Sequence, residues 1–428
     1  MDVKYLLIDN PYYEYHLLQQ KLSKLAADGW ELEKAGNFFW KFRRSYPQQV
    51  RYEIIFSPAA SAFNSQPTQA EEELADLCAL AGWERVASVA QLQIYRNPDP
   101  NATPLETDEV EKLNNIRRTM KKHFIPQQLL MIVLFVIQLL MHGSTALEHP
   151  TRTLSSMLMV TTLAMLLLVI ATYGILLVNN LLWLRKASRC VENGGTIPPS
   201  IFYRWFRWVI WGMVIGYLIL LFSVVEPYFT IWVLSLSIAL IGTTVGTITL
   251  CKRFNAPRWA NLAIPVVAGT LVVMAGTFLL ASIMDEVPLY SEQPRAELLT
   301  LEQLTGEPDT SLLVLESGSS PLTSYTRYFS TGEQEQISCT LVDIYAPFVY
   351  DTILNEQEQR YIRSHYYVGN AVISDELREL IGADYLRRST GPDADRFFIC
   401  WEDRIVLLHA TWTLTDEQAA VLADVWKP

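Results

Sequence analysis

Five long apolar stretches in the middle of the chain restrict its fold more than any other feature. None contains an Asp, Glu, Lys or Arg, and each has at least the roughly 17 residues that a helix needs to cross a hydrocarbon layer about 30 Å thick. Five such stretches are too many for the buried core helices of a soluble protein. The sequence therefore predicts a bundle of five transmembrane helices over Phe124–Met141, Met157–Trp183, Val209–Val225, Phe229–Leu250 and Ala260–Met284.

The basic residues around these stretches predict which side of the membrane each end occupies. The two loops expected on the outer side contain Arg152 as their only basic residue. The segments expected on the inner side contain Lys112, Arg117, Arg118, Lys121, Lys122, Arg185, Lys186, Arg189, Arg204, Arg207, Lys252, Arg253 and Arg258. Since cytoplasmic loops are enriched in Lys and Arg, we expect a multi-pass protein of the cell membrane, held in the lipid bilayer, with a cytoplasmic N-terminus and an extracytoplasmic C-terminus.

The membrane segments divide the chain into a cytoplasmic domain at residues 1–106, a linker helix at 107–123, the five helices at 124–284 and an outer domain at 285–428. The outer domain carries 25 acidic and 10 basic side chains. Such an acidic surface is not expected to bind nucleic acid. Thr107 has the position of an N-cap for a charged helix, Asp108–Lys122, that continues into the first span.

The N-terminal region contains an internal repeat. A strand-like stretch, Val3–Ile8, matches a second one, Val50–Ile55, and each precedes an amphipathic helical stretch. Both helical stretches end at a glycine that Trp and Glu follow, in Gly29-Trp30-Glu31 and Gly82-Trp83-Glu84. Two short alternating runs then complete each copy. We therefore expect a duplicated β-α-β-β domain of the α+β class with pseudo-two-fold symmetry.

Aromatic side chains from both copies suggest a groove at the pseudo-dyad that could hold a small molecule. The candidate ligand-binding residues are Trp30, Trp40, Tyr52, Trp83 and Tyr95. Aromatic residues of a small domain more often form its core, and the sequence leaves this second interpretation open.

Three stretches of the N-terminal region resemble a known bacterial family. They are Leu25-Ala26-Ala27-Asp28-Gly29-Trp30-Glu31-Leu32, Phe38-Phe39-Trp40-Lys41-Phe42 and Arg51-Tyr52. The family is that of domain of unknown function number 2812, whose members join this module to several transmembrane helices and often occur in Gram-positive bacteria beside PadR-type transcriptional regulators. The resemblance covers roughly residues 1–120. It implies a regulatory or sensory membrane role, with a cytoplasmic transcriptional regulator as a candidate partner, and it supplies no catalytic residues.

The outer domain has the pattern of a small α+β domain. Strands are expected at Ser311–Leu315, Ile337–Tyr345, Tyr385–Arg388, Arg396–Trp401 and Ile405–Trp412, and helices at Asn355–Arg363, Ser374–Ile381 and in a last segment that reaches Trp426. Cys339 and Cys400 both lie in strand-like runs on the outer side, where a disulfide can persist, so they are the candidate pair. Spacing alone leaves open whether their Cβ atoms are close enough.

Catalytic and metal-binding motifs are missing from the sequence. It has no Gly-x-Ser-x-Gly, His-Glu-x-x-His, P-loop or Cys-x-x-Cys pattern, so we predict no enzyme activity, no metal site and no cofactor.

The two-sided layout predicts a regulatory or sensory membrane protein that couples the outer domain to a cytoplasmic protein-interaction domain. The alternative is a small-molecule-binding or transport-associated protein that uses the aromatic groove. Gly212–Gly216 and Gly242–Gly246 have the GxxxG spacing of close helix contacts, within one chain or in a homo-oligomer.

Overall fold

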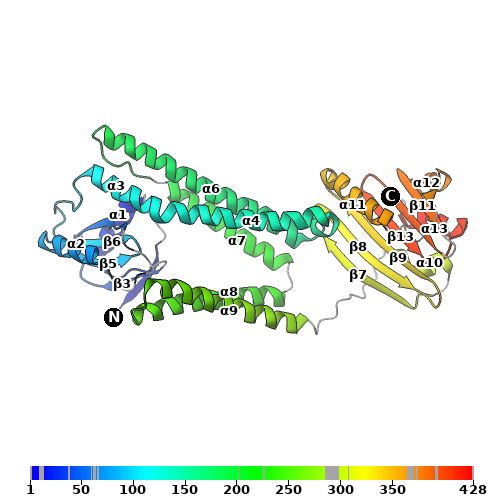
Figure 1. Cartoon of the computed structure of the whole chain (residues 1–428), viewed down its shortest axis with the longest axis horizontal. Coiled ribbons are helices and arrows are strands. Elements are labelled where there is room, and N and C mark those ends of the chain that lie inside the picture. Colours follow the sequence, from blue (N-terminus) through cyan, green and yellow to red (C-terminus); the bar gives the residue numbers. More distant parts are fainter. Residues whose placement is uncertain are drawn as a thin grey trace. The chain divides into compact units, whose positions relative to one another are not determined.

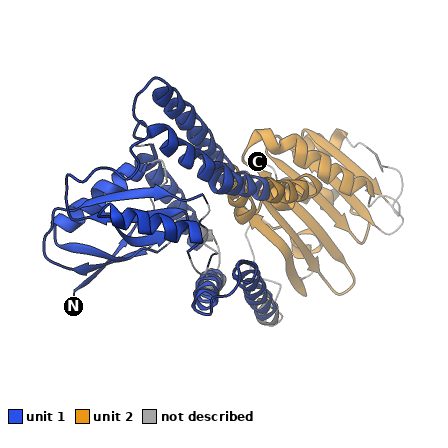
Figure 2. Cartoon of the chain, turned by 60° about the vertical axis from the view of Figure 1, so that its left-hand side comes forward, with its two compact units in different colours: residues 1–135, 168–280 blue, residues 136–167, 281–428 orange. Residues whose placement is uncertain are grey.

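The computed structural model describes residues 2–8, 14–36, 39–58, 60, 64, 67–200, 202–224, 227–284, 298–306, 308–363, 371–372, 375–390 and 394–426. The chain forms two compact units, residues 1–135 with 168–280 and residues 136–167 with 281–428 (Figure 2). The helices α4 (Ile125–Glu148) and α6 (Met157–Glu192) contribute residues to both units.

The N-terminal domain, residues 2–106 of the first unit, contains two three-stranded antiparallel sheets (Figure 1). Its elements are β1 (Val3–Leu7), α1 (Tyr15–Ala27), β2 (Trp30–Lys34), β3 (Phe39–Arg44), β4 (Arg51–Phe56), α2 (Gln69–Leu80), β5 (Glu84–Val89) and β6 (Leu92–Asn97). The strand orders are β1-β3-β2 and β4-β6-β5. The registers shift between Leu32 and Lys34 in β2, and between Arg85 and Ala87 in β5. The α+β composition predicted for this region is confirmed.

Local sequence explains where the two helices of this domain begin and end. In α1 the buried residues Leu18, Leu22 and Leu25 follow the helical repeat and form one apolar stripe. The residues Gly29 and Gly82, just beyond α1 and α2, have φ angles of +79° and +81°, the left-handed conformation that ends a helix.

Long apolar helices follow the N-terminal domain. They are preceded by α3 (Glu109–Thr119) and a π-helical turn, η2 (Met120–Phe124), and comprise α4, α6, α7 (Phe202–Val224), α8 (Pro227–Arg253) and α9 (Arg258–Met284). Four helical segments within the described ranges are long and apolar enough to cross a membrane: Glu109–Glu148, Met157–Glu192, Ile231–Arg253 and Arg258–Gly276. They contain most of the first, second, fourth and fifth predicted spans.

The third predicted span, Val209–Val225, falls largely within α7 and is not among these four segments. The first turns of α7 carry Arg204 and Arg207, which shortens its apolar part. The number of crossings therefore stays a prediction.

The linker helix runs into the first predicted span, as the sequence predicts. Its N-cap is Asp108 and not Thr107, because the Asp108 carboxylate accepts the N–H of Val110 at 2.8 Å.

The second unit is built on a seven-stranded sheet. Its elements are α5 (Pro150–Leu154), α10 (Leu301–Thr305), β7 (Ser311–Ser319), β8 (Thr323–Thr331), β9 (Gln336–Ile344), α11 (Tyr350–Arg363), β10 (Ala371–Val372), α12 (Asp375–Ile381), β11 (Tyr385–Thr390), β12 (Asp395–Cys400), β13 (Arg404–Ala410) and α13 (Asp416–Trp426). The strand order is β10-β11-β12-β13-β9-β8-β7, with every neighbouring pair antiparallel. The α+β composition predicted here is confirmed, while strands β8 and β10 were not predicted.

Alternating side chains give this sheet two covered faces. Along β9, Cys339 and Leu341 join a core that contains residues of α12 and α13, whereas Val342 and Ile344 join a second core with residues of α11. We call these the α13 face and the α11 face. The short helix α5, from the segment between α4 and α6, also packs here, because Thr151 N–H donates to Glu356 Oε2 at 2.7 Å.

Cys339 and Cys400, the candidate disulfide pair, are both free thiols in the structure. In register, Cys339 on β9 pairs with Leu408 and Cys400 on β12 pairs with Ile405, so the intervening strand β13 separates them. They also belong to cores on opposite faces of the sheet. Burial raises the pKa of each thiol to about 12, which keeps both protonated and unreactive at neutral pH.

Replacement of Gly29 by Ala should lower the melting temperature more than replacement of Gly82. Both variants adopt a left-handed conformation that costs an L-residue about 1 kcal/mol or more. A Cβ at Gly29 would also lie 2.9 Å from the carbonyl oxygen of Ser45, whereas the nearest atom at Gly82 is 3.5 Å away. Thermal unfolding of the purified protein in detergent measures the difference. Equal shifts would contradict the steric part of this argument.

Candidate functional site

The N-terminal domain and the extensions of the apolar helices share one hydrophobic core. Leu18, Leu22 and Trp40 of the domain belong to the same buried cluster as residues outside it. Those outside residues are Leu113, Ile116 and Met120 of α3 and η2, Trp183, Ala187 and Val191 of α6, and Ile197 of the segment that follows α6. Shared burial makes these parts pack as one body. We call this region, with the polar contacts described next, the joint.

Two carboxylates of the joint bind the backbone that connects α6 to α7. Glu109 Oε2 accepts the N–H of Ile197 at 2.8 Å, and Glu14 Oε1 accepts the N–H of Arg204 at 3.2 Å. The side chain of Glu14 is almost completely buried. Burial raises the pKa of Glu14, while hydrogen bonds from the Arg204 and Tyr203 backbone act in the opposite direction. The Glu14 bond fixes the start of α7 to the N-terminal domain, and the Glu109 bond fixes the preceding segment to α3.

Further polar contacts fix the ends of α3 and α6. Arg117 Nη2 donates to Ser188 Oγ at 2.6 Å, and Trp183 Nε1 donates to the carbonyl oxygen of Pro198 at 3.1 Å. In the π-helical turn η2, Lys122 Nζ donates to the carbonyl oxygen of Pro58 at 2.9 Å. Each of these three hydrogen bonds links residues that are at least 15 positions apart in the sequence. The joint thus attaches two of the apolar segments, and the first turn of α7, to one folded domain.

The five aromatic residues of the candidate groove are divided between two cores. Trp40 and Tyr52 lie in the core of the joint, whereas Trp83 and Tyr95 form a separate small core with Ile55 and Cys78. Trp30 is only partly buried and packs under two cations, Lys4 and Arg44, at 5.4 and 5.1 Å from its ring.

A recess beside Trp30 and Tyr52 offers no room for a ligand either. Its volume is about 10 Å³, which is about the space of one water molecule. Four of the five aromatic side chains are therefore core residues, and the fifth, Trp30, lies at the edge of the core of the joint with Lys4 and Arg44 over its ring.

The glutamates of the two Gly-Trp-Glu motifs meet at one arginine. Arg96 Nη2 donates to Glu84 Oε2 at 2.7 Å, and Arg96 Nη1 donates to Glu31. Arg43 adds a contact to Glu31 at 3.5 Å. Arg96 is on β6 and Glu31 on β2, so this ion cluster connects the two sheets. Spacing in the sequence predicted the repeat of these glutamates but not their common partner.

No group of three or more His, Cys, Asp or Glu residues that could hold a metal occurs among the described residues. Sequence reasoning also missed Glu14 and Glu109. An acidic residue at the start of a helix is usually an exposed charge that favours the helix dipole, and nothing local marks these two as acceptors of distant backbone N–H groups.

Residues 15–126 match the model of a family described as a protein of unknown function, DUF2812. The match covers about a quarter of the chain and includes α1, the two sheets apart from β1, and α3 with the following turn. The resemblance stated from the sequence motifs is therefore supported. Neither a curated protein nor a solved structure matches the chain.

Replacement of Glu14 by Ala should loosen the start of α7, whereas replacement by Gln should not. Ala removes the charged acceptor of the Arg204 N–H, at a cost of about 1–3 kcal/mol. Gln keeps an acceptor oxygen and removes the cost of burying a charge. Hydrogen–deuterium exchange of the peptide that contains Arg204 should be about tenfold faster or more in the Ala variant. Wild-type exchange in that variant would mean that Glu14 does not hold this segment.

Proposed function

We propose that this is a regulatory or sensory membrane protein with five transmembrane helices. In this proposal its N-terminus is cytoplasmic, its C-terminus is extracytoplasmic, and the membrane is the cell membrane. The distribution of Lys and Arg between the loops supports that orientation. The proposal includes α7 as the third crossing and treats the N-terminal domain as a duplicated β-α-β-β module.

The joint is the observation that carries this proposal. Helices that lie in lipid can tilt or rotate, and a domain packed into their extensions has to move with them. The contact of Glu14 with Arg204 attaches the domain to the start of α7. Glu109 attaches α3 to the segment that follows α6, and Arg117 attaches α3 to α6 itself. A change in helix arrangement therefore reaches the N-terminal domain without a flexible linker between them.

An exposed apolar patch on the N-terminal domain suits a protein partner. It consists of Val3, Tyr5 and Leu7 on β1 and Phe39 on β3, with Tyr5 and Phe39 about two-thirds exposed. Alternation places these side chains on the face of the sheet opposite the buried Trp40 and Phe42. Adjacent exposed apolar side chains of this kind often mark an interaction surface. The partner we propose is a cytoplasmic protein, with a transcriptional regulator as the candidate that the family resemblance implies.

The alternative of a small-molecule or transport role through an aromatic groove has less support. Four of its five residues are buried in two different cores, as described above. Candidate homo-oligomer contacts through the GxxxG pairs stay a prediction.

The orientation is tested with single cysteine variants. Tyr46 in the N-terminal domain and Phe348 before α11 are 85% and 78% exposed, so Cys introduced at either position is accessible to a thiol reagent. In intact cells, a membrane-impermeant maleimide should label Phe348→Cys, and it should label Tyr46→Cys only after permeabilisation. Equal labelling of the two variants in intact cells would contradict the proposed topology. Both variants are made in a Cys190→Ser background, and that background alone is the control, because Cys190 is partly exposed whereas Cys78, Cys251, Cys339 and Cys400 are buried.

The partner surface is tested by cross-linking in native membranes followed by mass spectrometry. A cytoplasmic protein captured by the wild type should be lost or reduced severalfold in the double variant Tyr5→Ser, Phe39→Ser, because both side chains belong to the patch. Leu80→Ser on α2 is a matched control, since Leu80 is 88% exposed and lies outside the patch. A form lacking residues 1–106 should capture no such partner. Identical partners for all forms would contradict the proposal.

A further inference from the structure

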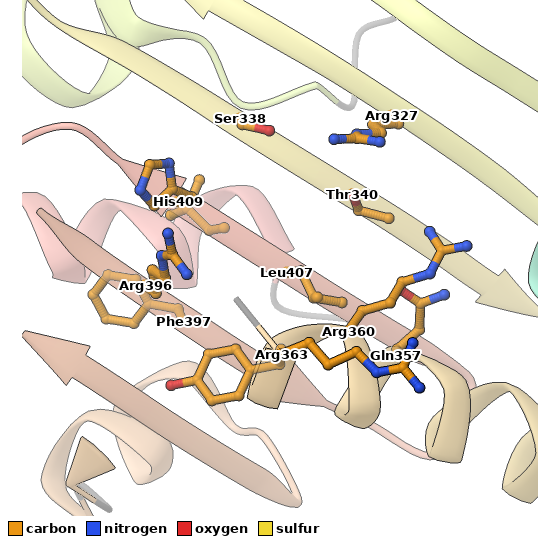
Figure 3. Close-up of a pocket in the computed structure, with 12 residues that line it drawn as sticks. Arg327, Ser338, Thr340, Gln357, Arg360, Arg363, Arg396, Phe397, Leu407 and His409 are labelled. Atoms are coloured by element: carbon orange, nitrogen blue, oxygen red, sulfur yellow. The ribbon is translucent and has the colours of Figure 1, made fainter. Parts of the chain in front are cut away.

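A cavity of about 600 Å³ opens on the α11 face of the seven-stranded sheet (Figure 3). Four arginines line it: Arg327 from β8, Arg360 and Arg363 from α11, and Arg396 from β12. Figure 3 shows their side chains around a common hollow, with His409 of β13 and Gln357 of α11 also at its wall. All of these residues belong to the second unit.

The charge of this cavity is opposite to that of the region that contains it. Residues 285–428 carry 25 acidic and 10 basic side chains, yet no Asp or Glu is among the described residues that line the cavity. The register explains part of this clustering. His409 pairs with Arg396 on one side and with Ser338 on the other, so three neighbouring strands present donors on the same face.

Internal ion pairs do not neutralise this group of arginines. Arg360 is bound to Glu356 at 2.6 Å. Glu316, which lies opposite Arg327 in register, contacts Arg152 at 3.8 Å instead. Within the described residues, neither Arg327 nor Arg363 has an ion pair. A positive excess of at least two charges is therefore left at the cavity.

Gln357 and His409 add two features that suit an anion. Gln357 is fully buried, its Nε2 donates to Thr151 Oγ1 at 2.7 Å, and its Oε1 has no hydrogen-bond partner among the described residues. A half-turn of the amide lets the Thr151 hydroxyl donate to Oε1 and frees the NH₂ group to donate to a ligand. Burial is the main cause of the lowered pKa of His409, and the positive charge of the neighbouring Arg396 lowers it further.

We propose that this cavity binds a small, soluble polyanion that carries carboxylate or phosphoryl groups. Arginine forms paired, charge-assisted hydrogen bonds with both kinds of group. The volume is that of a site for a small organic ligand, and Tyr361 and Leu407 supply an apolar wall for its carbon framework. The proposal stands apart from the regulatory role, because binding can be measured on the protein without any partner.

Isothermal titration calorimetry tests the site with the full-length protein in neutral detergent, at low ionic strength and without anionic lipid. The probes are citrate and inorganic pyrophosphate, with glycerol as an uncharged comparison. Saturable binding of at least one polyanion is expected, together with weaker binding in added potassium chloride. Hydrogen exchange should slow in α11 and β12 when that probe is bound. No saturable binding of either polyanion would overturn the proposal.

Arginine variants assign the binding to this cavity. Arg363→Gln and Arg396→Gln should each weaken binding about tenfold or more, since each removes a charge-assisted contact. Arg378→Gln is the matched control, because Arg378 is on α12, pairs with Asp375 at 3.4 Å and does not line the cavity. Equal affinity in Arg363→Gln and wild type would overturn the assignment. Arg363 is at the exposed end of α11, so this variant decides the question even if Arg396→Gln fails to fold.

Discussion

The long apolar helices leave many of their side chains uncovered by the rest of the protein, and lipid has to cover these side chains instead. The most apolar parts of Glu109–Glu148 and Ile231–Arg253 are not buried inside the protein at all, and Leu140 is 66% exposed. A helix can present such a surface to hydrocarbon because its backbone hydrogen bonds are made internally. Side-chain packing between distant parts of the chain is therefore concentrated in the two folded domains and in the joint. The cavity and the joint both lie in these packed regions.

The fold was predictable where a short stretch of sequence carries the information. The apolar runs indicate helices, and the Gly-Trp-Glu motifs mark where α1 and α2 end. The candidate sites were not predictable in the same way. The Glu14 carboxylate meets a backbone N–H 190 positions further along the chain. The arginines of the cavity come from β8, α11 and β12, and β8 was missed. The sequence left the choice between an aromatic groove and an aromatic core open for a related reason, because residue type alone does not separate a core tryptophan from one that lines a pocket.

The two Gly-Trp-Glu motifs have the same sequence, but their tryptophans lie in different surroundings. In both, the glycine ends a helix and the glutamate contacts Arg96. The tryptophans differ: Trp83 is fully buried in a small core, whereas Trp30 is partly exposed, with Lys4 and Arg44 over its ring. The motif is thus explained by helix termination and by an ion cluster that connects the two sheets. Catalysis is not needed to account for it.

The packing of α5 has a consequence for how the chain is made. Thr151 bonds to Glu356 and Gln357, which follow it by 205 and 206 positions. During synthesis Pro150–Leu154 emerges long before its binding surface exists, and all the helices from α6 to α9 have to be synthesised in between. Closing so long a loop carries a conformational entropy cost that later packing has to offset. This contact is therefore among the last to form. A protease that cuts near Thr151 would distinguish nascent chains from finished ones.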